Sequence, residues 1–95
     1  MLDIETEKQK AHEIIEETLA RYEALNGDIT KLRNGSYSNG EYGELQIKLQ
    51  TLALALEKAS PFVSGEPRYK QAREKESYFK EQLKQIRNGK NNKKH

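Results

Sequence analysis

The sequence contains no cysteine and no tryptophan, and it has only one methionine, two prolines and two histidines among 95 residues. Without cysteine, neither a disulfide framework nor thiol chemistry is available, and small secreted domains usually depend on disulfides. The N-terminal segment is acidic and lacks the basic and apolar regions of a signal peptide. These absences favour a cytoplasmic protein.

Long apolar runs are also missing. The longest strongly apolar stretch, Leu52–Leu56, falls far short of the roughly 18–20 residues that span a bilayer. Hydrophobic residues make up 34% of the chain, which is low for a globular domain. A small core of this kind is often completed by a second copy or by another protein, so we expect a protein partner or a homo-oligomer.

Residues for catalysis and cofactor binding are few. The two histidines are His12 and His95, and no further histidine or cysteine stands at metal-binding spacing from either. His12 and Glu16 are four residues apart, a spacing more typical of a solvated pair on one helix face than of a general base. No glycine-rich stretch has the pattern of a phosphate-binding loop. We therefore expect no enzyme activity, no metal site and no cofactor.

Three segments instead show the alternating three- and four-residue spacing that places side chains on one face of a helix. The first apolar stripe comprises Ala11, Ile15, Thr18, Tyr22, Leu25, Ile29 and Leu32. The second comprises Tyr42, Leu45, Leu49, Leu52, Leu56 and Ala59, and the third Tyr69, Ala72, Glu76, Phe79, Leu83 and Ile86. These stripes predict an all-α fold, a small three-helix up-down-up bundle. A helical hairpin that dimerises into a four-helix assembly is the alternative.

The second segment is the most apolar of the three. Besides its stripe it carries Ile47 and Leu54 on another face. A helix that is apolar on two sides is typical of a central element. We therefore expect the second helix to be buried on both faces.

Residue types at the segment starts indicate helix caps. Asp3 is suited to cap the first helix, because its side chain can accept from the free N–H groups of the first turn. Ser38 followed by Glu41 has the spacing of a capping box and predicts the start of the second helix. Pro67 has the fixed backbone angle of a first helical residue and predicts the start of the third.

Three other sites carry residues that break or end helices. At Asn26-Gly27 two interpretations stay open, a C-cap that splits the first segment and one continuous helix, because the stripe keeps its register there. Ser60-Pro61 is expected to end the second helix. Asn88-Gly89 is expected to close the third, which gives a single helical domain over 1–89 and a disordered basic tail over 90–95.

Charge is distributed unevenly along the chain. The first 26 residues contain seven acids and three bases, whereas the segment from residue 61 onward contains four acids and ten bases. In an up-down-up bundle the first and third helices run parallel and touch. We therefore expect their opposite charges to pair.

The basic third segment also suggests contact with nucleic acid. Arg73, Lys80, Lys84 and Arg87 are bases that could neutralise phosphates. Acids lie among them, however, and the spacing from Glu76 to Lys80 is that of an ordinary intrahelical pair. A solvated, salt-bridged helix face is the competing interpretation.

Two function classes follow. The first is a small non-enzymatic protein-interaction module (an adaptor, inhibitor, immunity or assembly factor) that binds a protein partner or itself through helical faces. Its candidate partner-binding residues are Tyr37 and Tyr42, as adaptable aromatic contacts, and Glu76, the one acid on an apolar stripe. The second is an accessory nucleic-acid-binding protein that uses the third helix and the tail. A membrane partner is not expected, since the basic helix lacks a bulky apolar face.

Overall fold

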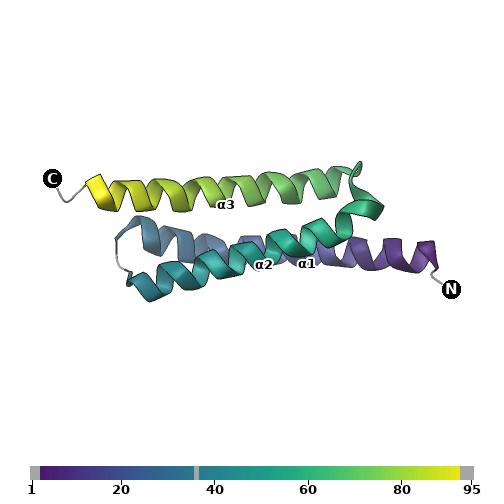
Figure 1. Ribbon diagram of the computed structural model, residues 1–95, viewed down its shortest axis with the longest axis horizontal. Helices are drawn as coiled ribbons and strands as arrows, with labels where there is room; N and C mark the ends of the chain where they lie inside the picture. Colours follow the sequence, from purple (N-terminus) through teal and green to yellow (C-terminus); the bar gives the residue numbers. More distant parts are fainter. Residues whose placement is uncertain (1–2, 36, 93–95) are drawn as a thin grey trace.

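The computed structural model describes residues 3–35 and 37–92, with the side chains of 89–92 excepted, and it shows a bundle of three helices (Figure 1). Helix α1 spans Ile4–Arg33, α2 spans Asn39–Val63 and α3 spans Pro67–Asn92. Each helix packs against the other two. Their directions alternate, so α1 and α3 run parallel (Figure 1). The predicted up-down-up bundle is confirmed.

The core follows one stripe of each helix. Every residue of the three predicted stripes is buried except Tyr42, Tyr69 and Ile86, which are half-buried and pack against the core. Leu19 is buried beside the first stripe. The three- and four-residue spacing therefore identified the packed faces correctly, because residues at these intervals lie one above another on a helix.

The predicted helix starts are confirmed by their hydrogen bonds. The Asp3 carboxylate accepts from the Glu5 N–H at 3.1 Å, which caps α1. The Ser38 hydroxyl accepts from the Glu41 N–H at 3.2 Å, and the Glu41 carboxylate accepts from the Ser38 N–H at 3.3 Å, which completes a capping box on α2. Pro67 is the first residue of α3.

Helix α1 runs through Asn26-Gly27 without interruption, which decides between the two interpretations of this site. The first helix ends only at the second Asn-Gly pair, Asn34-Gly35, where Gly35 has a φ of 82°. Glycine adopts this left-handed conformation without the steric penalty of a side chain. The first pair stays helical because the stripe continues beyond it, to Ile29 and Leu32 in the core.

Gly27 should therefore weaken α1. We expect Gly27→Ala to raise the free energy of unfolding by about 0.5–1 kcal/mol, since alanine is the better helix former and loses less backbone entropy on folding. Apart from its chain neighbours and the nearby backbone of its own helix, a Cβ at this position would meet no atom within 4 Å. Urea unfolding measured by circular dichroism checks the value. Gly35→Ala is the control and should lower stability, and a loss of stability in Gly27→Ala would contradict an uninterrupted α1.

The predicted end of the second helix is wrong. Helix α2 continues through Pro61 to Val63. Proline removes one N–H donor, but the last turn remains closed because the Ser64 N–H donates to the Ser60 carbonyl at 3.1 Å. Val63 is buried in the core, whereas Phe62 is partly exposed. Burial of Val63 therefore favours one further turn of helix.

The predicted end of the third helix is wrong as well. Helix α3 passes through Asn88-Gly89 and ends at Asn92. A glycine inside a helix costs only about 1 kcal/mol relative to alanine, so the pair need not stop it. The first part of the predicted tail, 90–92, thus has a helical backbone, and 93–95 lie outside the described residues.

The expectation that α2 is buried on two faces is also wrong. Ile47 is 66% exposed and Leu54 is 53% exposed. Both point away from the core, because α2 contacts its two neighbours through its main stripe. Within the described part of the chain, no fourth helix covers the outer face of α2.

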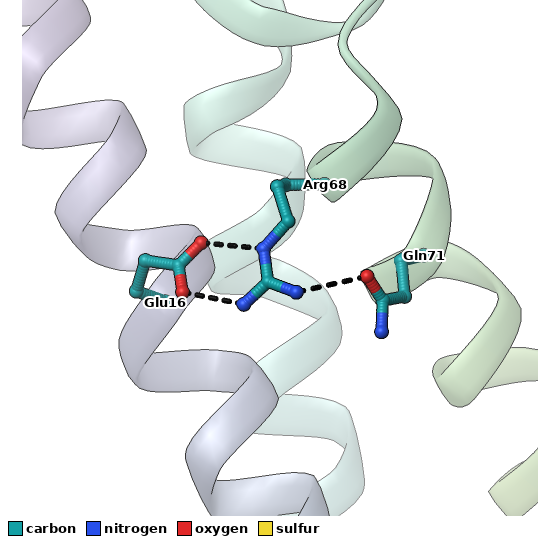
Figure 2. A network of polar contacts seen from close by, with 3 residues as sticks. All are labelled: Glu16, Arg68 and Gln71. Carbon is teal, nitrogen blue, oxygen red and sulfur yellow. Dashed lines mark hydrogen bonds and ion pairs between the residues drawn. The ribbon is translucent and has the colours of Figure 1, made fainter.

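A charged contact joins α1 to α3, as the charge distribution predicts (Figure 2). The Arg68 guanidinium donates from Nε and Nη2 to the Glu16 carboxylate, at 2.8 and 2.5 Å, and from Nη1 to the Gln71 side chain at 2.9 Å. These bonds hold the pKa of Glu16 below its ordinary value. His12, which is four residues before Glu16, contacts Glu66 instead, at 2.5 Å.

Candidate functional site: the groove between α2 and α3

An open groove with a volume of about 610 Å³ is lined only by residues of α2 and α3. Its floor is apolar and consists of Leu49 and Ala53 from α2 and Leu83 from α3. The two leucines belong to the core stripes and are buried, whereas Ala53 is half-buried. Because Ala53 carries only a methyl group, it leaves room above the leucines. We call this feature the α2–α3 groove.

The walls of the α2–α3 groove are polar and differ between the helices. On α3 they are formed by Lys80, Lys84 and Arg87, which follow one another at spacings of four and three residues. On α2 they are formed by Gln46 and Gln50, which are four residues apart. These spacings place each set along one edge of its helix. The groove therefore has a cationic wall and an uncharged amide wall.

Of the three cations on the α3 wall, one is paired with an acid and two are not. Lys80 donates to the Glu76 carboxylate at 2.8 Å. Lys84 and Arg87 form no ion pair with any residue in the part of the chain that the structure describes. No acid lines the groove within the same ranges. An anionic group entering it would thus meet two unpaired cations.

The two candidate tyrosines lie side by side, and Tyr42 lines the α2–α3 groove. The Tyr42 hydroxyl donates to the Leu83 carbonyl at 2.9 Å, which ties α2 to α3. Burial raises the pKa of Tyr42 above its ordinary value, although the positive charge of Arg87 opposes this effect. Tyr37 packs against Tyr42 with 6.1 Å between the ring centroids. Tyr42 therefore belongs to the groove, whereas Tyr37 contacts Tyr42 without lining the groove itself.

Glu76, the third candidate for partner contact, is only 7% exposed. Its carboxylate lies 3.2 Å from Arg73 and 2.8 Å from Lys80, both on its own helix. The contact with Arg73 is an ion pair without hydrogen-bond geometry. Glu76 Oε1 and Arg73 Nη1 therefore have no hydrogen-bond partner in the described structure. The position of Glu76 favours an indirect role, in which it fixes Lys80 at the edge of the groove.

The structure brings together three of the four bases proposed for nucleic-acid contact. Lys80, Lys84 and Arg87 share the groove wall, whereas Arg73 lies outside it. The guanidinium of Arg73 is 5.8 Å from the centroid of the Tyr69 ring. Its position beside an aromatic face and a buried acid indicates a structural contact.

Gln46, Gln50 and Ala53 were not identified from the sequence. They lie on a flank of the α2 stripe, and the stripe does not reveal which neighbouring helix that flank faces. The assignment depends on whether α3 packs on one side or the other of the α1–α2 hairpin. If the hand of the bundle were known, two glutamines and one alanine on the flank that faces α3 would indicate a groove between α2 and α3.

A second groove, with a volume of about 580 Å³, lies between α1 and α2. It contains the exposed Ile47 together with Ile14 and Ala55. Its rim carries charges of both signs, with Glu17 and Arg21 bonded to each other at 2.9 Å. Because the lining carries two acids, Glu17 and Asp28, and two bases, Arg21 and Lys48, its charge favours no ligand of a particular sign.

The side chains of the α2–α3 groove can hold an anion and cover an apolar surface. Within residues 3–35 and 37–92, no group of three potential metal ligands is found. In the same ranges, no helix has the length and apolar character needed to cross a membrane.

Comparisons with protein-family models, with curated proteins and with solved structures gave no match to this chain.

Proposed function

We propose that this chain is a non-enzymatic protein-interaction module that binds a protein partner through the α2–α3 groove. One observation carries the proposal: the groove opens between two helices above the half-buried Ala53, and two of its three cations, Lys84 and Arg87, lack acid partners in the described chain. Apolar surface rimmed by polar groups is typical of protein interaction sites. The adaptor, inhibitor, immunity and assembly roles considered from the sequence all use such a contact.

The groove suits a protein better than a nucleic acid. Lys80 is already bound to Glu76, so only Lys84 and Arg87 are free to contact phosphates there. Strong binding to a phosphate backbone usually needs several such contacts. Tyr78, which could have stacked on a base, lies in a different pocket beside α1 and packs edge-on against the Phe79 ring. Nucleic-acid binding therefore becomes the alternative outcome of the test.

Filling the groove should abolish partner binding. We expect tagged wild-type protein to retain a stoichiometric protein from nuclease-treated extract of its source cells, and Ala53→Trp to lose it because the indole occupies the space above Leu49. Ala55→Trp is the matched control and should retain the partner. Ala55 lies on the same helix with similar exposure, but it lines the groove between α1 and α2. Circular dichroism of both variants verifies that they fold.

The outcomes are distinct. Retention of the partner by Ala53→Trp would contradict a role for the α2–α3 groove. Loss by Ala55→Trp alone would transfer the function to the groove between α1 and α2. Recovery of nucleic acid, with no protein retained after nuclease treatment, would favour the nucleic-acid alternative.

A further inference from the structure

We infer that the occupant of the α2–α3 groove is an acidic amphipathic helix supplied by another protein. This inference rests on the proposed function and specifies the chemistry of the partner. It follows from three properties of the groove: the backbone hydrogen bonding of its two helices, its apolar lining residues and the charges of its walls.

The backbone around the groove favours a helix as the occupant. Both walls are α-helices, so their N–H and C=O groups are bonded within each helix and offer no edge to an added strand. A partner segment must therefore satisfy its own backbone, and an α-helix does so internally. The lining runs from Tyr42 to Ala53 on α2 and from Lys80 to Asn88 on α3. At about 1.5 Å per residue, these segments extend over two to three helical turns.

The floor indicates how such a helix would dock. Leu49 and Ala53 line the groove from α2, and Leu83 lines it from α3. Apolar side chains at spacings of three and four residues on the partner would cover this floor, as in other complexes that place a helix in a groove. The bundle would then gain a fourth helix, which is a common and stable arrangement.

The walls specify the charge of the partner. Lys80, Lys84 and Arg87 lie along one side, so the partner edge that faces α3 should carry Asp or Glu at matching intervals. Gln46 and Gln50 lie along the other side, where uncharged hydrogen-bonding groups suffice. Because Lys84 and Arg87 have no acid partner in the described chain, an acidic edge would neutralise them without breaking an existing ion pair.

A second copy of this chain is a poor occupant. Its acidic helix is α1, but α1 contributes no residue to the α2–α3 groove and packs on the other side of α2 and α3. If α1 of one copy filled the groove of the next, each copy would still present a free groove or a free α1. Such a contact is heterologous, so it generates a ring or a filament of many copies and does not close into a dimer. The partner is therefore a different protein.

Binding of designed peptides tests the inference. Two fluorescent peptides of about 20 residues share an apolar stripe of leucines, and one edge carries glutamate in the first peptide and glutamine in the second. We expect the glutamate peptide to bind the wild-type protein about tenfold more tightly at low salt, as two or three exposed ion pairs would produce. Lys84→Glu/Arg87→Glu should remove this preference, and a peptide with lysine on that edge should bind the variant instead.

A matched charge reversal separates a local contact from long-range attraction. Lys70→Glu/Lys75→Glu changes the net charge equally on the same helix, but neither residue lines the groove. This control should keep the preference for glutamate. Equal binding of the two peptides, an equal loss in the control variant, or tighter binding of a DNA duplex would each overturn the inference.

Failure of the inference can be told from failure of the proposed function. Capture of the cellular partner is measured with Ala53→Trp and with Lys84→Glu/Arg87→Glu. If only Ala53→Trp abolishes capture, the groove binds a protein but not through an acidic edge, and the inference falls alone. If neither variant affects capture, the proposed function falls as well. Loss of capture in both supports the acidic helix.

Discussion

Replacing Leu56 with alanine should lower the free energy of unfolding by about 2–5 kcal/mol, one of the two largest losses that we expect from a single substitution. Leu56 is 0% exposed and belongs to the C-terminal half of the α2 stripe. Alanine removes three buried carbon atoms and leaves a cavity that surrounding helices cannot fully close. A domain of this size is stable by only about 5–15 kcal/mol, so the variant should unfold at much lower urea concentration.

Leu54 provides the matched control, since it is the same residue type two positions away on the same helix. It is 53% exposed and points away from the core. Leu54→Ala should therefore change the free energy of unfolding by less than about 0.5 kcal/mol. Because the chain has no tryptophan, far-UV circular dichroism is the suitable signal for both variants. Similar losses in Leu56→Ala and Leu54→Ala would show that the outer face of α2 is covered in solution, contrary to its exposure here.

The features of the fold that depend on local spacing could be predicted from the sequence. The three stripes, the capping box at Ser38 and the first residue of α3 all follow from interactions between residues a few positions apart. The helix ends could not be predicted in this way. Pro61 and Asn88-Gly89 disfavour helix locally, yet α2 extends to a buried Val63 and α3 passes through Gly89. Packing against other helices decides such ends, and local residue type does not reveal it.

The candidate site was predictable only in part for the same reason. Lys80, Lys84 and Arg87 could be grouped from the sequence because they share one helix edge. Their meeting with Gln46 and Gln50 requires that α3 lie on a particular side of α2. Apolar stripes specify which faces pack but not the hand in which three helices are arranged. The burial of Glu76, in contrast, follows from its place on the third stripe.

The second large effect concerns the aromatic pair at the centre of the bundle. The rings of Tyr22 on α1 and Phe79 on α3 are stacked, with 5.5 Å between centroids and 15° between planes. Both side chains are essentially fully buried. Phe79→Ala should lower the free energy of unfolding by about 3–5 kcal/mol, because it removes the ring that stacks on Tyr22 and leaves a cavity. Urea unfolding measures the loss.

Tyr22→Phe is the informative partner of this substitution, because it keeps the ring and removes only the hydroxyl. That hydroxyl is buried and has no hydrogen-bond partner in the described structure. A buried polar group without a partner costs about 1–3 kcal/mol. Tyr22→Phe should therefore leave stability unchanged or raise it by up to about 1 kcal/mol. A clear loss would show that the hydroxyl has a partner in solution, such as a buried water molecule.

The pH dependence of stability gives an independent test of the same site. Burial raises the pKa of Tyr22 above its ordinary value of 10.0, and the negative charge of Glu76 adds to this effect. Above pH 10.0 the unfolded chain releases the phenolic proton while the folded chain retains it. The contribution of Tyr22 to stability is therefore complete below this pH and decreases as the pH rises. Phenylalanine has no such proton, so stability should decline less steeply in Tyr22→Phe than in the wild type. The exposed control Tyr78→Phe should behave like the wild type, and equal slopes for all three proteins would show that Tyr22 is not buried as described.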